Sequence, residues 1–288
     1  ILHRTVATVA RGGSYLLNVG PDGKGRIPAP AAENLIKAGQ WIKAHPEVVY
    51  AAGPSPWGMA LPWGDVTTSA DKLNLVVFDW PQDRRIHLSG FEGEIVSATL
   101  KAPTGEGLGL KWTANGSWIA IEGGDLPASA LSGPASVIEL KLKAAPKVDT
   151  TPGVHPNVAT DLLVEFAEVE GATKKEIRWM EKFGEWKHMN QVSAWSENGA
   201  ASWTVEVAAA GAYHLNLKYK GEERPVWKVT TDEGAMIQNQ QAATAVYHSY
   251  PFGMLHFARP GRHTITVSLV EGDPEKSSLA ALRLRPAH

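Results

Sequence analysis

The chain has 288 residues and contains no cysteine. Disulfides, thiolate metal sites and cysteine nucleophiles are therefore excluded. The sequence also lacks a strong charge of either sign, because 28 Lys and Arg oppose 30 Asp and Glu for a formal net charge of -2. This balance argues against a nucleic-acid partner, which would require a basic surface. No apolar run approaches the roughly 20 residues of a membrane span, so we expect none.

Several motifs are missing as well. The first residue is Ile1 and no signal-peptide pattern follows it, so we expect a piece of a longer polypeptide. Gly23-Lys24 does not form a phosphate-binding loop, because Asn18 stands where that motif requires glycine and Gly25 follows the lysine. The sequence contains no HExxH, GxSxG or EF-hand pattern. It therefore predicts no cofactor and no metal site.

Tryptophan, by contrast, is abundant, with 11 residues. A buried indole needs a hydrogen-bond partner for its N–H group, whereas an exposed indole offers a flat face that suits a sugar ring. The tryptophans therefore fit two interpretations, which are core residues of the fold and a glycan-binding surface.

The first fifty residues alternate between helical and strand patterns. A helix is predicted to end near residue 11, because apolar residues recur at helical spacing and Gly12-Gly13 follows. Tyr15–Val19 is a short apolar run typical of a strand buried on both faces. Pro30–Ala44 is predicted to be a helix. Its predicted inward stripe comprises Leu35, Ile36, Gly39, Trp41 and Ile42. Helix, strand and helix in this order indicate an α/β unit at residues 1–48.

The remaining chain is predicted to form two antiparallel β-sandwiches, at 49–145 and 158–288, joined by a proline-containing linker at 146–157. Strands of the first sandwich are expected at 72–79, 85–88, 95–100, 108–113, 118–122 and 136–142. Strands of the second are expected at 162–168, 201–207, 212–219, 226–231, 253–257, 263–270 and 279–284.

Asn115-Gly116-Ser117 carries two interpretations. The triplet matches the glycosylation signal, but Asn-Gly between two strands is also a strong hairpin turn, and we favour the hairpin.

A pair of catalytic carboxylates is not evident in the sequence. Glycoside hydrolysis requires two carboxylates about 5 to 9 Å apart, and no two acidic residues lie at neighbouring strand ends of one α/β unit. Asp22 follows the predicted strand but is interpreted as a turn residue. We therefore expect no catalytic residue in this chain.

The first half of the chain resembles a known enzyme family. Arg11-Gly12-Gly13-Ser14-Tyr15-Leu16-Leu17-Asn18-Val19-Gly20-Pro21 is similar to the last barrel strand of the glycoside hydrolase family 29 alpha-L-fucosidases, with Ser14-Tyr15 departing from the family's usual Asn-Leu. The similarity continues through further short motifs as far as about residue 145. These are Gly25, Ile27-Pro28, Gly39-Gln40-Trp41-Ile42, Val49-Tyr50, Pro54-Ser55-Pro56-Trp57, Leu61-Pro62-Trp63-Gly64 and Phe78-Asp79-Trp80-Pro81.

This resemblance implies a (β/α) barrel that precedes Ile1 and carries a retaining mechanism with an Asp nucleophile and a Glu acid/base. The fold class is then mainly β, with the last strand and helix of the barrel followed by the two sandwiches. Asn18, Gly20 and Pro21 would form a wall of the active site, because barrel sites lie at the carboxyl ends of the strands. Family members also suggest a periplasmic or secreted location.

The predicted strand at Tyr15–Val19 points to a partner independently of the family. It is apolar on both faces and needs a neighbouring strand on each side. We therefore expect the amino-terminal part of the barrel to pair with it, as a separate or missing polypeptide.

The last 130 residues resemble the sandwich of carbohydrate-binding modules of families 6 and 35, on four stretches: Val164–Glu168, Ala201–Val205, Ala209–Tyr213 and Arg259–Ile265. Such modules often hold calcium through glutamates of the first strand and an Asp near the last. Leu279–Leu282 offers no such Asp, so no calcium is expected at Glu165 and Glu168. A surface that contacts fucosylated glycans is predicted from aromatic residues in irregular stretches. These are Trp179, Trp186, Trp195, Trp227, Tyr247 and Tyr250, whereas Trp203 is expected in the core.

The leading hypothesis is the carboxy-terminal portion of a retaining alpha-L-fucosidase, inactive by itself because the catalytic carboxylates lie upstream. The alternatives are a stand-alone carbohydrate-binding module and a structural spacer.

Overall fold

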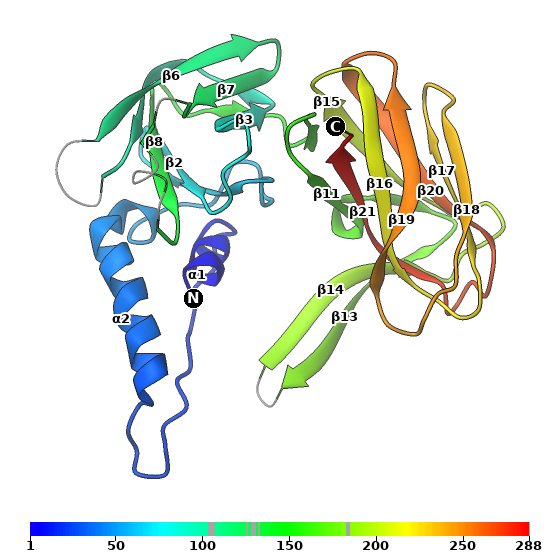
Figure 1. The fold of residues 1–288 in the computed structure, drawn as a ribbon, viewed down its shortest axis with the longest axis horizontal. Coiled ribbons are helices and arrows are strands. Elements are labelled where there is room, and N and C mark those ends of the chain that lie inside the picture. The colour runs from blue at the N-terminus through cyan, green and yellow to red at the C-terminus, as the bar shows by residue number, and fades with distance from the viewer. Residues whose placement is uncertain (103–106, 125, 128–130, 132, 183–184, 288) are drawn as a thin grey trace. The chain divides into compact units, whose positions relative to one another are not determined.

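The computed structural model describes residues 1–288 except 103–106, 125, 128–130, 132, 183–184 and 288, and it describes no side chains at 181–186. The chain is mainly β and divides into two compact units, Ile1–Thr150 and Thr151–His288 (Figure 1). The boundary falls inside the stretch 146–157 that the sequence marks as a linker.

The first unit is built on one antiparallel sheet with the strand order β1-β2-β8-β5-β6-β7-β3. A short pair, β4 with β9, lies beside it. The strands are β1 (Gly64–Ser69), β2 (Lys72–Val77), β3 (Arg85–Ser89), β4 (Phe91–Glu92), β5 (Ile95–Leu100), β6 (Leu108–Asn115), β7 (Trp118–Glu122), β8 (Ser136–Leu142) and β9 (Lys147–Val148). The six strands expected from the sequence are therefore confirmed, and β1, β4 and β9 are additions to them.

Strands from the two ends of this sheet, β2 near one end and β7 and β3 at the other, pack against each other around an apolar core. Leu73 and Leu75 of β2 pack with Ile86 of β3 and Ile121 of β7, and all four side chains are fully buried. Alternate residues along each strand point to opposite faces, so every second residue enters this core.

The opposite face of the same sheet carries the two helices, α1 (Leu2–Val9) and α2 (Ala29–Ala44). Val76 and Val137, paired across β2 and β8, pack against Val6 of α1 and against Ala38 and Trp41 of α2. β2 is therefore buried on both faces, one against the opposing strands and one against the helices.

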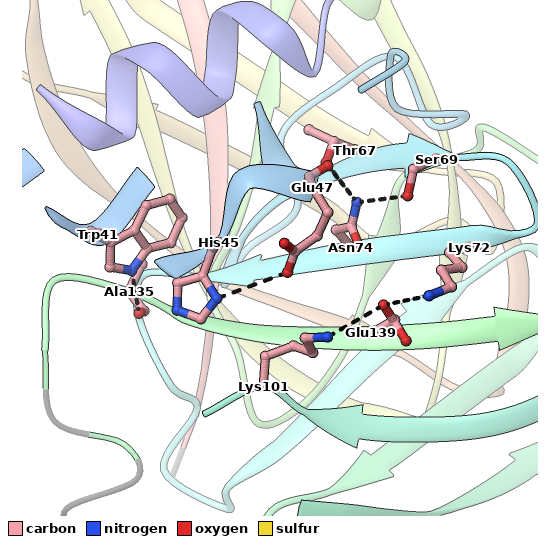
Figure 2. A network of polar contacts seen from close by, with 10 residues as sticks. All are labelled: Trp41, His45, Glu47, Thr67, Ser69, Lys72, Asn74, Lys101, Ala135 and Glu139. Carbon is pink, nitrogen blue, oxygen red and sulfur yellow. Dashed lines mark hydrogen bonds and ion pairs between the residues drawn. The ribbon is translucent and has the colours of Figure 1, made fainter. Parts of the chain in front are cut away.

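Polar contacts complete this helix–sheet interface (Figure 2). The indole N–H of Trp41 donates to the carbonyl of Ala135 at 3.0 Å. The 3₁₀ turn η1 (Pro46–Val48) follows α2, and its Glu47 carbonyl accepts from the Asn74 amide at 3.1 Å. Within the sheet itself, the ammonium of Lys72 on β2 donates to Glu139 on β8 at 2.9 Å. Helix α2 and the turn that follows it are thus held on the sheet by apolar and polar contacts together.

Trp57, Trp63 and Trp80 of the family-like motifs belong to the sandwich core or pack against it. The ring N–H of Trp57 donates to the carbonyl of Ser89 at 2.9 Å, and that of Trp63 to His87 at 3.1 Å. Trp80 donates to the hydroxyl of Ser136 at 3.1 Å. Each of these three indoles therefore has a partner for its N–H, which accounts for them as residues of the fold's interior.

The Asn115-Gly116-Ser117 triplet forms the hairpin turn between β6 and β7. Asn115 pairs with Trp118, and Gly116 adopts a φ of 59° that suits glycine. The hairpin interpretation is confirmed.

The second unit is a sandwich of two sheets, with strand orders β10-β15-β20-β17-β18 and β13-β14-β21-β16-β19. Strand β12 pairs with β15, and β11 with β21. The strands of the first sheet and its branch are β10 (Gly153–Val154), β12 (Glu168–Glu170), β15 (Ala200–Val207), β17 (Val226–Thr231), β18 (Met236–Gln240) and β20 (Gly261–Glu271). Those of the second are β11 (Thr160–Leu163), β13 (Thr173–Lys182), β14 (Glu185–Ser193), β16 (Gly211–Lys220), β19 (His248–Phe257) and β21 (Ser278–Pro286), with the 3₁₀ turn η3 (Val164–Phe166) after β11.

The core of this sandwich is rich in aromatic residues. Trp203 is fully buried, as expected, and its ring N–H donates to the carbonyl of Leu163 at 2.9 Å. Tyr213 and Phe257 lie edge to face, with their ring centroids 5.7 Å apart. Every strand predicted after residue 200 is present, and the predicted strand 162–168 is instead split into β11, η3 and β12.

Two predictions about the first fifty residues are wrong for the described chain. Tyr15–Val19 forms no strand, and Leu16 is 92% exposed, because none of the strands described in this chain lies beside it to share its backbone hydrogen bonds. Ile36, expected on the inward stripe of α2, is 59% exposed, because α2 turns Ala38 and Trp41 toward the sheet.

We predict that Gly64→Ala destabilises the first unit by roughly 2 kcal/mol or more. A Cβ at this position would lie 2.0 Å from the carbonyl oxygen of Val76, and the glycine has a φ of 157°. Urea unfolding measures the effect, with Gly109→Ala as the control, because a Cβ there meets no atom within 4 Å. Equal stability of the two variants would contradict the close packing of β1 on β2.

We also predict that His45 makes the first unit sensitive to acid. Burial lowers the pKa of His45 below its ordinary value of 6.5, and the carboxylate of Glu47, 3.9 Å away, opposes this effect. At a pH between the two pKa values, His45 therefore binds a proton in the unfolded chain but not in the folded protein. Stability is complete above about pH 6.5 and is lost as the pH falls through the folded pKa, by up to about 1.4 kcal/mol per pH unit.

The variant His45→Phe should weaken this loss, since a phenyl ring does not titrate and preserves the contact with Trp41, whose ring centroid is 5.0 Å away. Urea unfolding between pH 7.5 and 5, about the range over which histidine titrates, measures the slope of the unfolding free energy against pH. The exposed His214 of β16 provides the control variant His214→Phe, which should leave the slope unchanged. An unchanged slope in His45→Phe would contradict the assignment.

Candidate functional site

The segment between α1 and α2 carries the residues predicted to line an active site. Asn18, Gly20 and Pro21 are all exposed and lie in residues 13–28, which extend away from the sheet of the first unit (Figure 1). The apolar run before them is exposed too, with Leu16 and Leu17 at 92% and 37%. The predicted wall residues are therefore exposed together with the apolar run that precedes them.

Asp22 gives this segment a defined turn. One carboxylate oxygen accepts the backbone N–H groups of Lys24 at 2.8 Å and of Arg26 at 2.9 Å, and the other accepts the Arg26 guanidinium at 3.0 Å. These bonds lower the pKa of the Asp22 carboxyl. Its oxygens are occupied by the loop itself, which agrees with the interpretation of Asp22 as a turn residue.

Helix α1 is tied to β1 by a partly buried ion pair. Arg11, just after the helix, donates to the carboxylate of Asp65, whose side chain is 2% exposed. Burial raises the pKa of Asp65, and the hydrogen bond and charge of Arg11 act against this rise. The arginine of the Arg11-Gly12-Gly13 motif therefore positions the start of the exposed segment relative to the sheet.

A groove of about 480 Å³ lies between the two helices. Its lining is Ile1, Leu2, His3, Asn34, Lys37, Ala38, Phe78 and Pro134. Ile1 of this lining and Ile36 of α2 are exposed, at 42% and 59%. We call Leu16, Leu17, Ile27, Ile36 and this groove the helix-pair surface.

In the second unit, two residues predicted to contact glycans are part of the core, and this prediction is wrong for them. Trp195 is 5% exposed and donates its ring N–H to the carbonyl of Ser277 at 2.9 Å. Trp227 is fully buried, edge to face with Trp195 at 5.4 Å. Trp227 lies within β17, the strand predicted at 226–231, where apolar residues pack between the two sheets, so its assignment to the aromatic surface disagreed with that predicted strand.

Three of the other predicted residues reach the surface to different degrees. Trp179 on β13 is 40% exposed. Tyr247 and Tyr250 are half-buried, and Tyr250 stacks on Tyr219 with a centroid separation of 4.3 Å. The structure does not bring Trp179 together with these tyrosines in any described contact. The side chain of Trp186 lies outside the described residues.

The sequence analysis missed a polar cleft in the second unit. It has a volume of about 390 Å³ and is lined by residues of β11, η3, β13, β14, β16 and β21. Its polar lining residues are Glu165, Glu176, Arg178, His188, Asn190 and Lys218. The sequence signal for this cleft is the spacing of Glu176 and Arg178, two residues apart on β13, which places both on one face of the strand. Such a pair of opposite charges also fits an ordinary solvated strand surface, so it did not indicate a binding site.

The described residues offer neither a metal-binding cluster nor a membrane-spanning helix. In that part of the chain, no group of three or more His, Asp or Glu side chains could hold a metal ion. Neither α1 nor α2, the helices described, is long and apolar enough to cross a membrane.

Comparison with known proteins concentrates on one enzyme family. Residues 1–47 match the family model described as alpha-L-fucosidase. The alpha-L-fucosidase of Dictyostelium discoideum is 36% identical over 106 residues, which are 35% of this chain and 23% of that protein. Human tissue alpha-L-fucosidase is 31% identical over 141 residues, 46% of this chain and 28% of that protein. The chain thus spans about a quarter of these relatives.

A solved structure extends the likeness to nearly the whole chain. The alpha-L-fucosidase from Vibrio sp. strain EJY3 aligns with 99% of this chain and 50% of its own, with a TM-score of 0.67. At 19% sequence identity this similarity concerns the fold alone. Taken together, the sequence matches support a relationship between this chain and the glycoside hydrolase family 29 alpha-L-fucosidases.

Proposed function

We propose that this chain is the carboxy-terminal portion of a retaining alpha-L-fucosidase, which hydrolyses alpha-L-fucosides of glycans. In this proposal the chain supplies the last strand and helix of the catalytic barrel together with the accessory sandwiches. The observation that carries it is the exposed apolar run with Leu16 at 92% exposure, inside the 47 residues that match the alpha-L-fucosidase model.

The exposed run has the properties of a barrel strand without its neighbours. An apolar side chain such as Leu16 loses about 1.5–3 kcal/mol of favourable transfer energy when it stays in water. A closed barrel would cover it on both faces and pair its backbone on both sides. The amino-terminal part of a barrel is therefore the partner that this segment fits, either as a separate polypeptide or as the preceding part of the same one.

The helix-pair surface supports the same partner. α2 is covered by the sheet on the side of Ala38 and Trp41, while Ile36 and the groove beside Asn34 and Lys37 remain open. Barrel helices pack on one face against their own strands and on another against the neighbouring helix. An upstream helix would fill the open side.

The chemistry itself belongs to the upstream part in this proposal. Retaining hydrolysis requires an acid/base and a nucleophile about 5–5.5 Å apart. The role of Asn18, Gly20 and Pro21 is to close one wall of the sugar site. The role of the first sandwich is to hold α1 and α2, and with them this wall, through the ion pair of Arg11 with Asp65.

The alternatives are a stand-alone carbohydrate-binding module and a structural spacer. A stand-alone carbohydrate-binding module would bind glycans without any effect on hydrolysis. A structural spacer would neither bind glycans nor affect hydrolysis. Both leave the exposed run at Leu16 without a partner, which is why we prefer the enzyme portion.

The test is a fusion in which the Dictyostelium discoideum alpha-L-fucosidase loses the segment that matches this chain and receives residues 1–150 in its place. We expect the fusion to hydrolyse 4-nitrophenyl alpha-L-fucoside, while the 288-residue chain alone and the truncated relative alone stay near background. Retention of the anomeric configuration, followed by NMR, tests the mechanism. Ordinary turnover by the chain alone, or a folded but inactive fusion, would refute the proposal.

Within the fusion, Leu16→Asp should lower activity or assembly by about tenfold or more, because burying one leucine contributes about 1.5–3 kcal/mol. Leu108→Asp is the matched control, since Leu108 is 46% exposed on β6 of the same unit. Equal activity of both variants would show that the exposed run does not enter a barrel.

A further inference from the structure

The polar cleft of the second unit lies where strand β21 changes its neighbour. Strand β14 meets β21 at Val192 and Leu279, whereas β11 pairs with β21 from Leu163 and Ala281 onward. The residues of β14 that precede Val192 form a hairpin with β13 that extends away from the sandwich (Figure 1). We call this hairpin of β13 and β14 the arm. The cleft of about 390 Å³ occupies this junction, and its volume falls in the range of about 300–1,000 Å³ typical of small-molecule sites.

The arm presents four polar lining residues on one face. Glu176 lies opposite Asn190 and Arg178 lies opposite His188, and residues two apart on a strand point the same way. The guanidinium of Arg178 donates to the Glu176 carboxylate at 2.7 Å. This pairing brings the two side chains together and leaves further donors and acceptors of both available.

The sandwich supplies the other side of the cleft. Ala280 and Ala281 are small, so they leave the space open, and Leu163 adds an apolar surface that is 43% exposed. Lys218 of β16 lies opposite Ala281 and adds an ammonium group to the lining. On the same side of β16, two residues away, Asn216 is 91% buried, and its amide oxygen lacks a partner within the described structure.

The charges of the cleft identify the class of ligand. Two cations, Arg178 and Lys218, balance the two carboxylates Glu165 and Glu176, and His188 and Asn190 add further polar atoms. A polyanion would face the carboxylates, and a polycation would face the guanidinium and the ammonium. A neutral molecule with many hydroxyl groups can donate to the carboxylates and accept from Arg178, Lys218 and Asn190.

We propose that this cleft binds a unit of a neutral oligosaccharide. The ligand class rests on the proposed function, since a fucosidase portion works on glycans, whereas the place of the site rests on the cleft alone. The site would hold a glycan chain for the enzyme at the junction of the arm with the sandwich.

The aromatic surface at Tyr247 is less suited to this role. The Tyr247 hydroxyl already donates to Gln191 at 2.7 Å, and the ammonium of Lys220 lies 5.3 Å from the centre of its ring. Tyr250 stacks on Tyr219 at 4.3 Å. Much of the ring surface that a sugar would need is therefore in contact with other residues.

The test is isothermal titration of the full chain with 2′-fucosyllactose, lactose, xylotriose and mannotriose, and with trigalacturonate as the anionic probe. We expect at least one neutral glycan to bind and trigalacturonate not to bind. The double variant Arg178→Ala with Lys218→Ala should weaken that binding by about tenfold or more, as the loss of two charge-assisted hydrogen bonds implies. Both side chains are exposed, and circular dichroism checks that the fold is preserved.

Two control variants locate the site. Lys175→Ala changes an exposed cation on the same strand that does not line the cleft, and it should not alter the affinity. Tyr247→Ala should not alter it either. The proposal is overturned if no neutral glycan binds, if trigalacturonate alone binds, or if Tyr247→Ala abolishes binding while the double variant retains it. Because this titration needs no barrel, its outcome is independent of hydrolysis by the fusion.

Discussion

The burial of strand β2 on both faces is the constraint on which the first unit depends. Leu73 and Leu75 of β2 point into the sandwich core. Val76 of the same strand points to the opposite face and packs against the helices. A strand in this position couples two cores, so the helix pair cannot detach without exposing Val76 and its partner Val137. The sandwich is therefore the platform that holds α1 and α2 in place, and the exposed segment between them is anchored at both ends.

This coupling explains why residues 1–48 remain folded although their apolar run is uncovered. Two helices and one extended segment are too few to form a core alone. The sheet provides the missing surface for α2 through Ala38 and Trp41, and Arg11 fixes the end of α1 on Asp65. What the sheet cannot provide is a neighbouring strand for Tyr15–Val19. In the proposed enzyme, the accessory sandwich thus supports one wall of the catalytic site from outside the barrel.

The sequence predicted elements whose signal is local, and it failed where the outcome depends on distant residues. Alternation around Leu73 and Leu75 predicted β2, and Asn115-Gly116 predicted its hairpin. The arm of β13 and β14 was missed because its polar residues show no buried face. Trp227 was assigned to the surface although its strand was predicted, because burial in a sandwich depends on the facing sheet. The cleft joins β13, β14, β16 and β21, so the spacing of Glu176 and Arg178 on one strand was not enough to reveal it.

The most direct test of the account is hydrogen–deuterium exchange at Tyr15–Val19, measured in the chain alone and in the active fusion with an alpha-L-fucosidase barrel. We predict rapid exchange of these amides in the chain alone, because they lie in no described strand, and strong protection in the fusion, where neighbouring strands accept their hydrogen bonds. Protection already present in the chain alone, or rapid exchange in a fusion that hydrolyses fucosides, would contradict the role of this segment as a barrel strand.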